Sequence, residues 1–283
     1  MRGSTVTNRY AWVLAMPFAA AACLSCWADD PAVHPLVDQA RKADERRYQF
    51  ALEQGAKVLP TSDGKSFYVL WLPESGKKGP PPIIATIHGH ASWAFDEFFL
   101  WHPEAKERGF GILAIQWWLG KGERFQDYLS PDEVYAVVDE VFEKEGVKPG
   151  TAVFHGFSRG SANSYAVAAS DTHSGNRYFA LFIANSGRAA MDFPSNVAIE
   201  DGEYGEKPLT GTHWVTYAGA KDTNPDRDGY NGMRAAAEWV RKQGGTVDLA
   251  IEDPEGNHGG FHRNPKNISK ALDCFEKRLP KRK

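Results

Sequence analysis

The chain has 283 residues, of which 42% are hydrophobic and 24% charged, and its formal net charge is −3. This length and apolar content suffice for one sizeable core, and α/β proteins often use such a length as a single domain. A charge this near neutral argues against a nucleic-acid partner, because such binders normally carry a strongly basic face.

The first 28 residues differ from the rest of the sequence. Arg2 and Arg9 precede or flank an apolar run at 11–22, which is too short to span a membrane, and no acidic residue occurs before position 29. This pattern predicts a signal peptide at 1–28, and a periplasmic or secreted domain at 29–283 without stable membrane insertion. A lipid anchor on Cys23 is the alternative to a soluble form.

Helix-like and strand-like segments alternate through the rest of the chain, after a helical lead-in at 29–56. The predicted strands lie at 66–72, 83–87, 111–117, 151–155, 179–184, 213–217 and 246–252. The predicted helices lie at 95–108, 131–144, 161–169, 232–243 and 267–278. The alternation predicts an α/β fold with a mostly parallel central sheet and helices on both faces. Ligands of such sheets lie at the carboxyl ends of the strands.

The pattern Gly-x-Ser-x-Gly occurs at 156–160, between a predicted strand and a predicted helix. A serine that projects from a sharp, strained turn needs neighbours almost without side chains, which Gly156 and Gly160 supply. The helix that follows directs its first amide groups toward negative charge that develops at the serine. The segment therefore predicts Ser158 as a nucleophile.

In this setting the chain resembles the α/β-hydrolase superfamily, of serine esterase type, over roughly 65–279. Residues 87–91 read Ile-His-Gly-His-Ala directly after a buried strand, and they resemble the His-Gly oxyanion-hole motif of that superfamily. The resemblance implies that the backbone N–H of Arg159, with that of His90 or Ala91, binds the oxyanion. His90 stands where a second glycine is common, so His90 and Ala91 both remain candidates for the second oxyanion donor.

The resemblance also implies an acid after the penultimate strand and a base after the last one. Asp222 matches the acid, while Asp226 and Asp228 in the same loop remain alternatives. His258 matches the base, with His262 as its rival four residues on. Nucleophile, acid and base then follow in the chain order that this fold requires, and the resulting Ser-His-Asp mechanism needs no cofactor.

A small-molecule or polymer ester is the expected substrate, because the chain resembles secreted feruloyl and acetylxylan esterases and polyester depolymerases. Aromatic residues at strand ends are candidate substrate contacts, namely Trp93, Trp117 and Trp118. Glucuronoyl esterases also carry an arginine directly after their serine. By that partial resemblance the Arg159 side chain helps the oxyanion or holds an acidic group of the substrate; otherwise it pairs with an acidic loop.

Three other interpretations compete with a serine esterase. The histidines His88, His90, His258 and His262 suggest a metal-dependent hydrolase, although the acid and histidine that usually follow such a pair are missing. Alternating oxygen ligands at 224–229 resemble a calcium loop, without the glutamate that normally closes it. Exposed aromatic residues would also suit a non-catalytic carbohydrate-binding protein, which would not need a nucleophile, an acid and a base in order.

Overall fold

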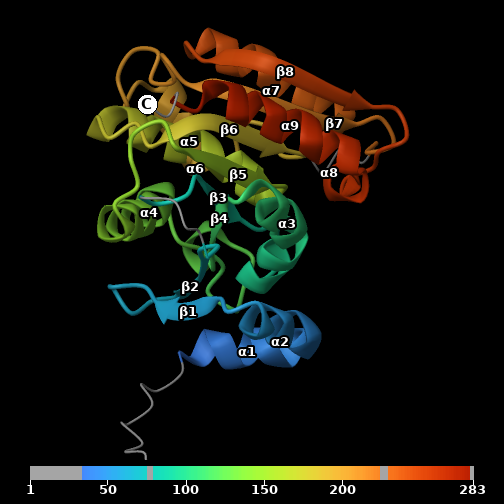
Figure 1. Ribbon diagram of the computed structural model, residues 1–283. Coiled ribbons are helices and arrows are strands. Elements are labelled where there is room, and N and C mark those ends of the chain that lie inside the picture. The colour runs from blue at the N-terminus through green and yellow to red at the C-terminus, as the bar shows by residue number, and fades with distance from the viewer. Residues whose placement is uncertain (1–33, 75–78, 224–228, 281–283) are drawn as a thin grey trace, which may run out of the picture. The chain divides into compact units, whose positions relative to one another are not determined.

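The computed structural model describes residues 34–74, 79–223 and 229–280, which belong to one contact unit, His34–Lys283 (Figure 1). The expected signal peptide, including Cys23, lies outside the described residues, as does most of the calcium-like loop. None of the helices within the described ranges is both long enough and apolar enough to cross a membrane.

A sheet of eight strands forms the centre of this unit, in the order β1-β2-β4-β3-β5-β6-β7-β8. The strands are β1 (Lys57–Pro60), β2 (Phe67–Trp71), β3 (Ile83–Ile87), β4 (Gly111–Ile115), β5 (Ala152–Phe157), β6 (Phe179–Asn185), β7 (His213–Gly219) and β8 (Thr246–Asp253). The first strand pairs antiparallel with the second, and the second with β4, whereas all pairs from β4 to β8 are parallel. The predicted α/β class with a mostly parallel sheet is thus confirmed.

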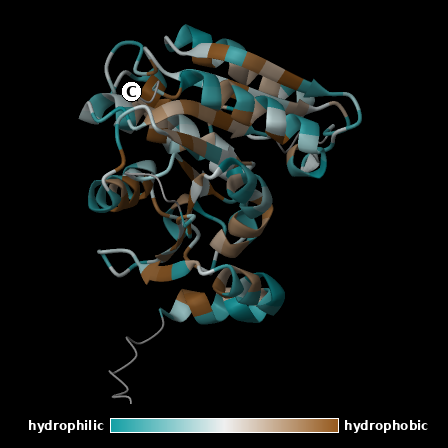
Figure 2. Ribbon diagram, in the orientation of Figure 1, coloured by the Kyte–Doolittle hydropathy of each residue, from teal (hydrophilic) through white to brown (hydrophobic). Residues whose placement is uncertain are grey.

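Helices cover both faces of the sheet. One face carries α1 (Pro35–Ala43), α2 (Glu45–Glu53), α3 (Ala94–Arg108), α8 (Gly260–Arg263) and α9 (Pro265–Arg278). The other carries α4 (Pro131–Glu145), α5 (Arg159–Ser174), α6 (Pro194–Glu200) and α7 (Tyr230–Lys242). Figure 2 shows hydrophobic residues along the central strands and hydrophilic stretches on the helices, as expected for helices that bury one side against a sheet.

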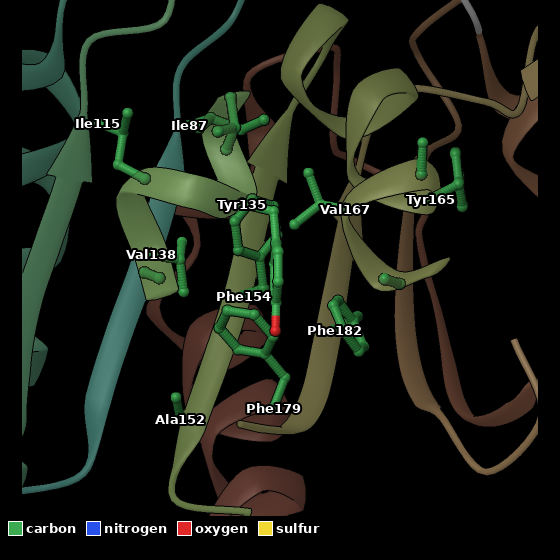
Figure 3. Close-up of a cluster of buried hydrophobic side chains, with 14 of the residues drawn as sticks. Ile87, Ile115, Tyr135, Val138, Ala152, Phe154, Tyr165, Val167, Phe179 and Phe182 are labelled. Atoms are coloured by element: carbon green, nitrogen blue, oxygen red, sulfur yellow. The ribbon is translucent and has the colours of Figure 1, made fainter. Parts of the chain in front are cut away.

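Two apolar cores result, one on each face, because successive side chains of a strand point to opposite faces. In β3, Ile83 and Ile87 belong to the core under α4–α7, while Ile84 belongs to the core under α3 and α9. Figure 3 shows part of the first core, where Phe154 and Phe182 pack among side chains from α4 and α5. Burying each such large side chain contributes on the order of 1.5–3 kcal/mol, so both cores hold the strand ends in fixed positions.

Four short elements were not predicted from the sequence, one of which is a 3₁₀ turn, η1 (Phe125–Asp127). The edge strand β1 exposes both its end residues and lacks a long apolar run. The helix α8 has only four residues and α6 only seven, too few to show a helical period. The predicted lead-in helix is divided at Asp44, whose side chain accepts a hydrogen bond from the Arg47 amide and so begins α2.

Candidate active site

Ser158 occupies a strained turn between the last residue of β5 and the first of α5. Its φ of 53° and ψ of −118° are unusual for a residue with a side chain, and such conformations cost on the order of 1–3 kcal/mol. Its amide donates to the Asn185 carbonyl oxygen at 2.8 Å, and its own carbonyl accepts from the Ala162 amide at 3.0 Å. These bonds hold the turn, so that the hydroxyl projects at the carboxyl edge of the sheet.

Glycines surround this turn because neighbouring backbone leaves no room for a side chain. A Cβ atom on Gly156 would lie 2.5 Å from the Gly160 carbonyl oxygen, and one on Gly160 would lie 2.6 Å from the His88 carbonyl oxygen. A third glycine, Gly187, follows β6, and a Cβ there would overlap the Ser158 carbonyl oxygen. The sequence pattern predicted the first two glycines; the third is distant in the chain and carries no local signal.

The structure brings the predicted nucleophile, base and acid together. The Ser158 hydroxyl donates to His258 Nε2 at 2.8 Å, and His258 Nδ1 donates to Asp222 Oδ2 at 2.7 Å. This direction of donation is inferred from the partners, since a carboxylate accepts and therefore fixes the proton on Nδ1. The Asp222 side chain is only 5% exposed, whereas that of His258 is 19% exposed. The carboxylate is thus shielded from water, and the ring remains reachable.

Two loops at the ends of β7 and β8 position the acid and the base. The Asp222 amide donates to the Gly219 carbonyl oxygen at 2.9 Å, and the Tyr230 amide donates to the Asp222 carbonyl oxygen at 2.8 Å. Gly256 and Gly260 flank His258 in sequence and pack directly on the Tyr217 hydroxyl, where a Cβ would overlap it. The alternative acids, Asp226 and Asp228, lie outside the described residues.

The loop after β3 distinguishes the two candidate oxyanion donors. Ala91 has a φ of 44°, and its amide donates to the Tyr128 hydroxyl at 3.1 Å. The backbone amide of His90 has no acceptor among the described residues, while its ring Nδ1 lies 3.1 Å from the same hydroxyl. The Arg159 amide belongs to the first turn of α5, where amides have no intrahelical acceptor. The open pair of amides is therefore that of His90 and Arg159.

The side chain of Arg159 differs from the expected pairing with an acidic loop. No carboxylate of the described residues lies within ion-pair distance of its guanidinium group, and its Nε is buried without an acceptor. The guanidinium carbon lies 4.3 Å from the ring centre of Tyr128, 5.0 Å from that of Phe125 and 5.4 Å from that of Phe193. Burial lowers the pKa of this group from its usual value. Sequence reasoning missed these three aromatic residues, which are far apart in the chain.

The three tryptophans predicted as substrate contacts do not line one common cavity. Trp117 is 2% exposed, donates from Nε1 to the His88 carbonyl oxygen at 2.8 Å, and lines the cavity beside Arg159. Trp93 and Trp118 pack on each other with ring centres 5.1 Å apart, and neither lines that cavity. Trp117 therefore supports the loop after β3 by its hydrogen bond to the His88 carbonyl oxygen. Trp93 and Trp118 form a separate aromatic pair.

The histidines of the metal interpretation are not gathered either. Within the described residues, the group with metal-ligating spacing is instead Glu97, His155 and His262, beneath β5. Both ring nitrogens of His155 already have partners there, because Trp101 donates to Nδ1 at 3.2 Å and Asn185 lies 3.2 Å from Nε2. Burial, together with the neighbouring His155, lowers the pKa of His262 to about 3. His262, the rival base, is thus a half-buried residue of this cluster whose two ring nitrogens are buried and uncharged near neutral pH.

No protein-family profile and no curated protein sequence matches this chain. Solved structures do match it. A bacterial heroin esterase is 16% identical with a TM-score of 0.62, covering 87% of this chain and 92% of its own. An esterase of Pyrobaculum calidifontis is 14% identical with a TM-score of 0.60, covering 86% and 94%. A putative dienelactone hydrolase of Klebsiella pneumoniae is 16% identical with a TM-score of 0.59, covering 78% and 98%. The chain therefore has the α/β-hydrolase fold, as its motifs suggested.

Proposed function

We propose that this protein of α/β-hydrolase fold is a serine esterase that cleaves carboxylic esters through an acyl-enzyme. The observation that carries the proposal is the hydrogen-bonded chain from Ser158 through His258 to Asp222, which starts on a strained turn beside two open amides. Such a chain activates a hydroxyl that is otherwise a weak nucleophile. The proteins of similar structure include esterases and a putative dienelactone hydrolase, which supports an ester as the bond attacked.

In the proposed reaction, the Ser158 oxygen attacks the ester carbonyl carbon while His258 Nε2 takes the hydroxyl proton. The carbonyl oxygen becomes an oxyanion, which the amides of Arg159 and His90 would stabilise. As the tetrahedral intermediate collapses, the bond to the alcohol oxygen breaks, and the imidazolium returns its proton to that alcohol. Water then attacks the acyl-enzyme and gives a proton to the same ring; the bond between the acyl carbon and the Ser158 oxygen breaks, the acid leaves, and the ring returns the proton to Ser158. Asp222 holds the ring orientation and stabilises its charged form throughout.

The residues in this scheme use proton transfer and backbone amides alone, so no cofactor is needed for it. The proposed substrate is either a small ester or an ester within a polymer. The non-catalytic carbohydrate-binding alternative offers no reason for a strained serine with an ordered base and acid behind it.

Export to the periplasm or the medium is part of the proposal, and it rests on the charge and hydropathy pattern of residues 1–28. Cleavage after Ala28 would give a mature chain that begins at Asp29. N-terminal sequencing of the protein from the cell envelope fraction tests this point. An intact Met1, or a lipid on Cys23, would contradict a soluble exported form.

The test of the catalytic proposal is Ser158→Ala, measured with a panel of 4-nitrophenyl esters. We expect kcat/KM to fall by about 10⁴-fold or more, as for removal of other activated serines. The matched control is Ser164→Ala, which removes a buried hydroxyl on the same helix that donates only to the Ser161 carbonyl oxygen. Wild-type turnover by the Ser158 variant would end the proposal.

A further inference from the structure

A cavity of about 530 Å³ lies beside the nucleophile turn, with Arg159 in its wall. Most of its lining is apolar or aromatic, including Trp117, Leu119, Phe125, Tyr128, Leu129 and Phe193. Its volume falls in the range that holds a small organic ligand. Charged side chains are few in this lining, namely Lys65, Glu133 and Arg159.

These three charges are not equivalent. Lys65 and Glu133 form an ion pair with each other, so neither needs a ligand. Arg159 has no such partner among the described residues, and its Nε is buried without an acceptor. The acids that act on it through space are Asp192, Glu123 and Asp127, and none of them forms an ion pair with it; Glu123 is 81% exposed and lies beside His90. Asp127 instead accepts a hydrogen bond from the Arg124 amide at 2.8 Å, and Asp192 is exposed to water.

Three aromatic rings surround the guanidinium group, and its carbon lies over the face of each ring. A cation over a ring face is stabilised by the ring quadrupole, most strongly where water is excluded, and this helps to offset the lost hydration. Ring faces are not conventional hydrogen-bond acceptors, so the guanidinium N–H groups stay available, and their planar arrangement fits the two oxygens of a carboxylate. The first turn of α5 adds a positive electrostatic potential at the same place, since Arg159 is its first residue.

We propose that this cavity, through the Arg159 side chain, binds a carboxylate carried by the ester substrate. The apolar body of the ester would contact Leu119, Phe125 and Phe193, and the ester bond would lie at Ser158, the residue next to Arg159. This inference rests on the proposed esterase function and narrows its substrate class to esters with a free carboxylate. Anionic esters should gain about 10- to 100-fold in kcat/KM over uncharged ones of equal length, chiefly through KM.

Two matched pairs of substrates test the preference. The hemiester 4-nitrophenyl glutarate and its methyl ester differ only in a carboxylate on the acyl side, and 4-acetoxybenzoate and its methyl ester differ on the alcohol side. We expect the anionic member to be preferred in at least one pair. In Arg159→Gln that preference should fall at least tenfold, and in Arg159→Lys it should be intermediate, because lysine keeps the charge without the planar fork.

The matched control is Arg124→Gln, which removes an equal charge from a 76% exposed side chain near the cavity that does not line it. Its preference should equal that of the wild type, since an exposed charge is largely screened by salt. If Arg159→Gln and Arg124→Gln lose the preference equally, the preference arises from general surface charge, and the proposal is overturned. The absence of any preference in both pairs would also overturn it.

Binding to the Ser158→Ala variant separates this inference from the catalytic one. Calorimetry should give a Kd for the hemiester of glutarate at least tenfold lower than for its methyl ester, and Arg159→Gln in the same background should remove the difference. If the wild type hydrolyses neither ester but the anionic one still binds selectively, the esterase proposal fails and the carboxylate site stands. Equal affinities for both esters would overturn the carboxylate site.

Discussion

Two neighbouring residues, Ser158 and Arg159, face environments of opposite kinds. The serine hydroxyl belongs to a chain in which each group has a partner at 2.7–2.8 Å, ending on a buried carboxylate. The arginine side chain is held by ring faces alone and has no carboxylate partner among the described residues. The comparison indicates that the first region is organised for one reaction before substrate arrives, whereas the second leaves a charge to be satisfied by a ligand.

Disrupting the hydrogen-bonded chain from Ser158 to Asp222 should have the largest effect on turnover. Asp222→Asn removes the negative charge and the acceptor that fixes the proton on His258 Nδ1, so kcat should fall by about 10⁴-fold with the fold intact. Ester hydrolysis and circular dichroism of the purified variant test this. Asp226→Asn and Asp228→Asn should do far less. A larger loss from either of these would transfer the acid role to that residue.

Gly187→Ala should disturb the same catalytic chain, because it displaces the backbone of the Ser158 turn. A methyl group there would overlap the Ser158 carbonyl oxygen, so the strained turn must shift. A displacement of about 1 Å at a reacting atom lowers turnover about 10²-fold. We expect that loss, together with a lower melting temperature. As a comparison, Gly175→Ala changes a glycine at the far end of α5 with open space around it, and should affect stability alone. Full activity of the Gly187 variant would mean that the turn tolerates the shift.

Tyr128 links the two regions, because its ring lies under Arg159 and its hydroxyl accepts from the Ala91 amide. Tyr128→Phe keeps the ring but releases the loop that carries the His90 amide. We expect kcat to fall by about tenfold, with KM changed little, since the loss concerns the transition state. Tyr135→Phe is the control, because that hydroxyl bonds to Asp171 and Ser174 instead. A change confined to KM would assign Tyr128 to substrate binding.

The smallest effect should come from the buried cluster beneath β5, and it concerns stability. Because the folded protein lowers the pKa of His262 to about 3, the unfolded chain binds an extra proton below about pH 6.5. Stability should therefore be full above that pH and should fall as the pH decreases toward 3, by up to about 1.4 kcal/mol per pH unit. His262→Phe should flatten this slope in urea titrations between pH 7 and pH 5. An unchanged slope would show that other groups set the acid sensitivity.

The parts of the fold that the sequence predicts are those with local causes. The parallel strands are continuous apolar runs, as at Ile83–Ile87, and the nucleophile turn requires Gly156 and Gly160 for steric reasons that a short pattern displays. The environment of Arg159 has no local cause, since Phe125 lies on η1 and Phe193 directly before α6, both far from Arg159 in the chain. The edge strand β1 was missed for a related reason, because its pairing with β2 rather than its own hydropathy makes it a strand.

Ser158 can be identified as the nucleophile by locating the covalent adduct of a fluorophosphonate with mass spectrometry of proteolytic peptides. We expect one phosphonyl group on Ser158, formed rapidly in the wild type and slowly in Asp222→Asn, and absent in Ser158→Ala. Rapid labelling that persists in Ser158→Ala, or an adduct on another residue of the wild type, would contradict Ser158 as the nucleophile and with it the proposed function.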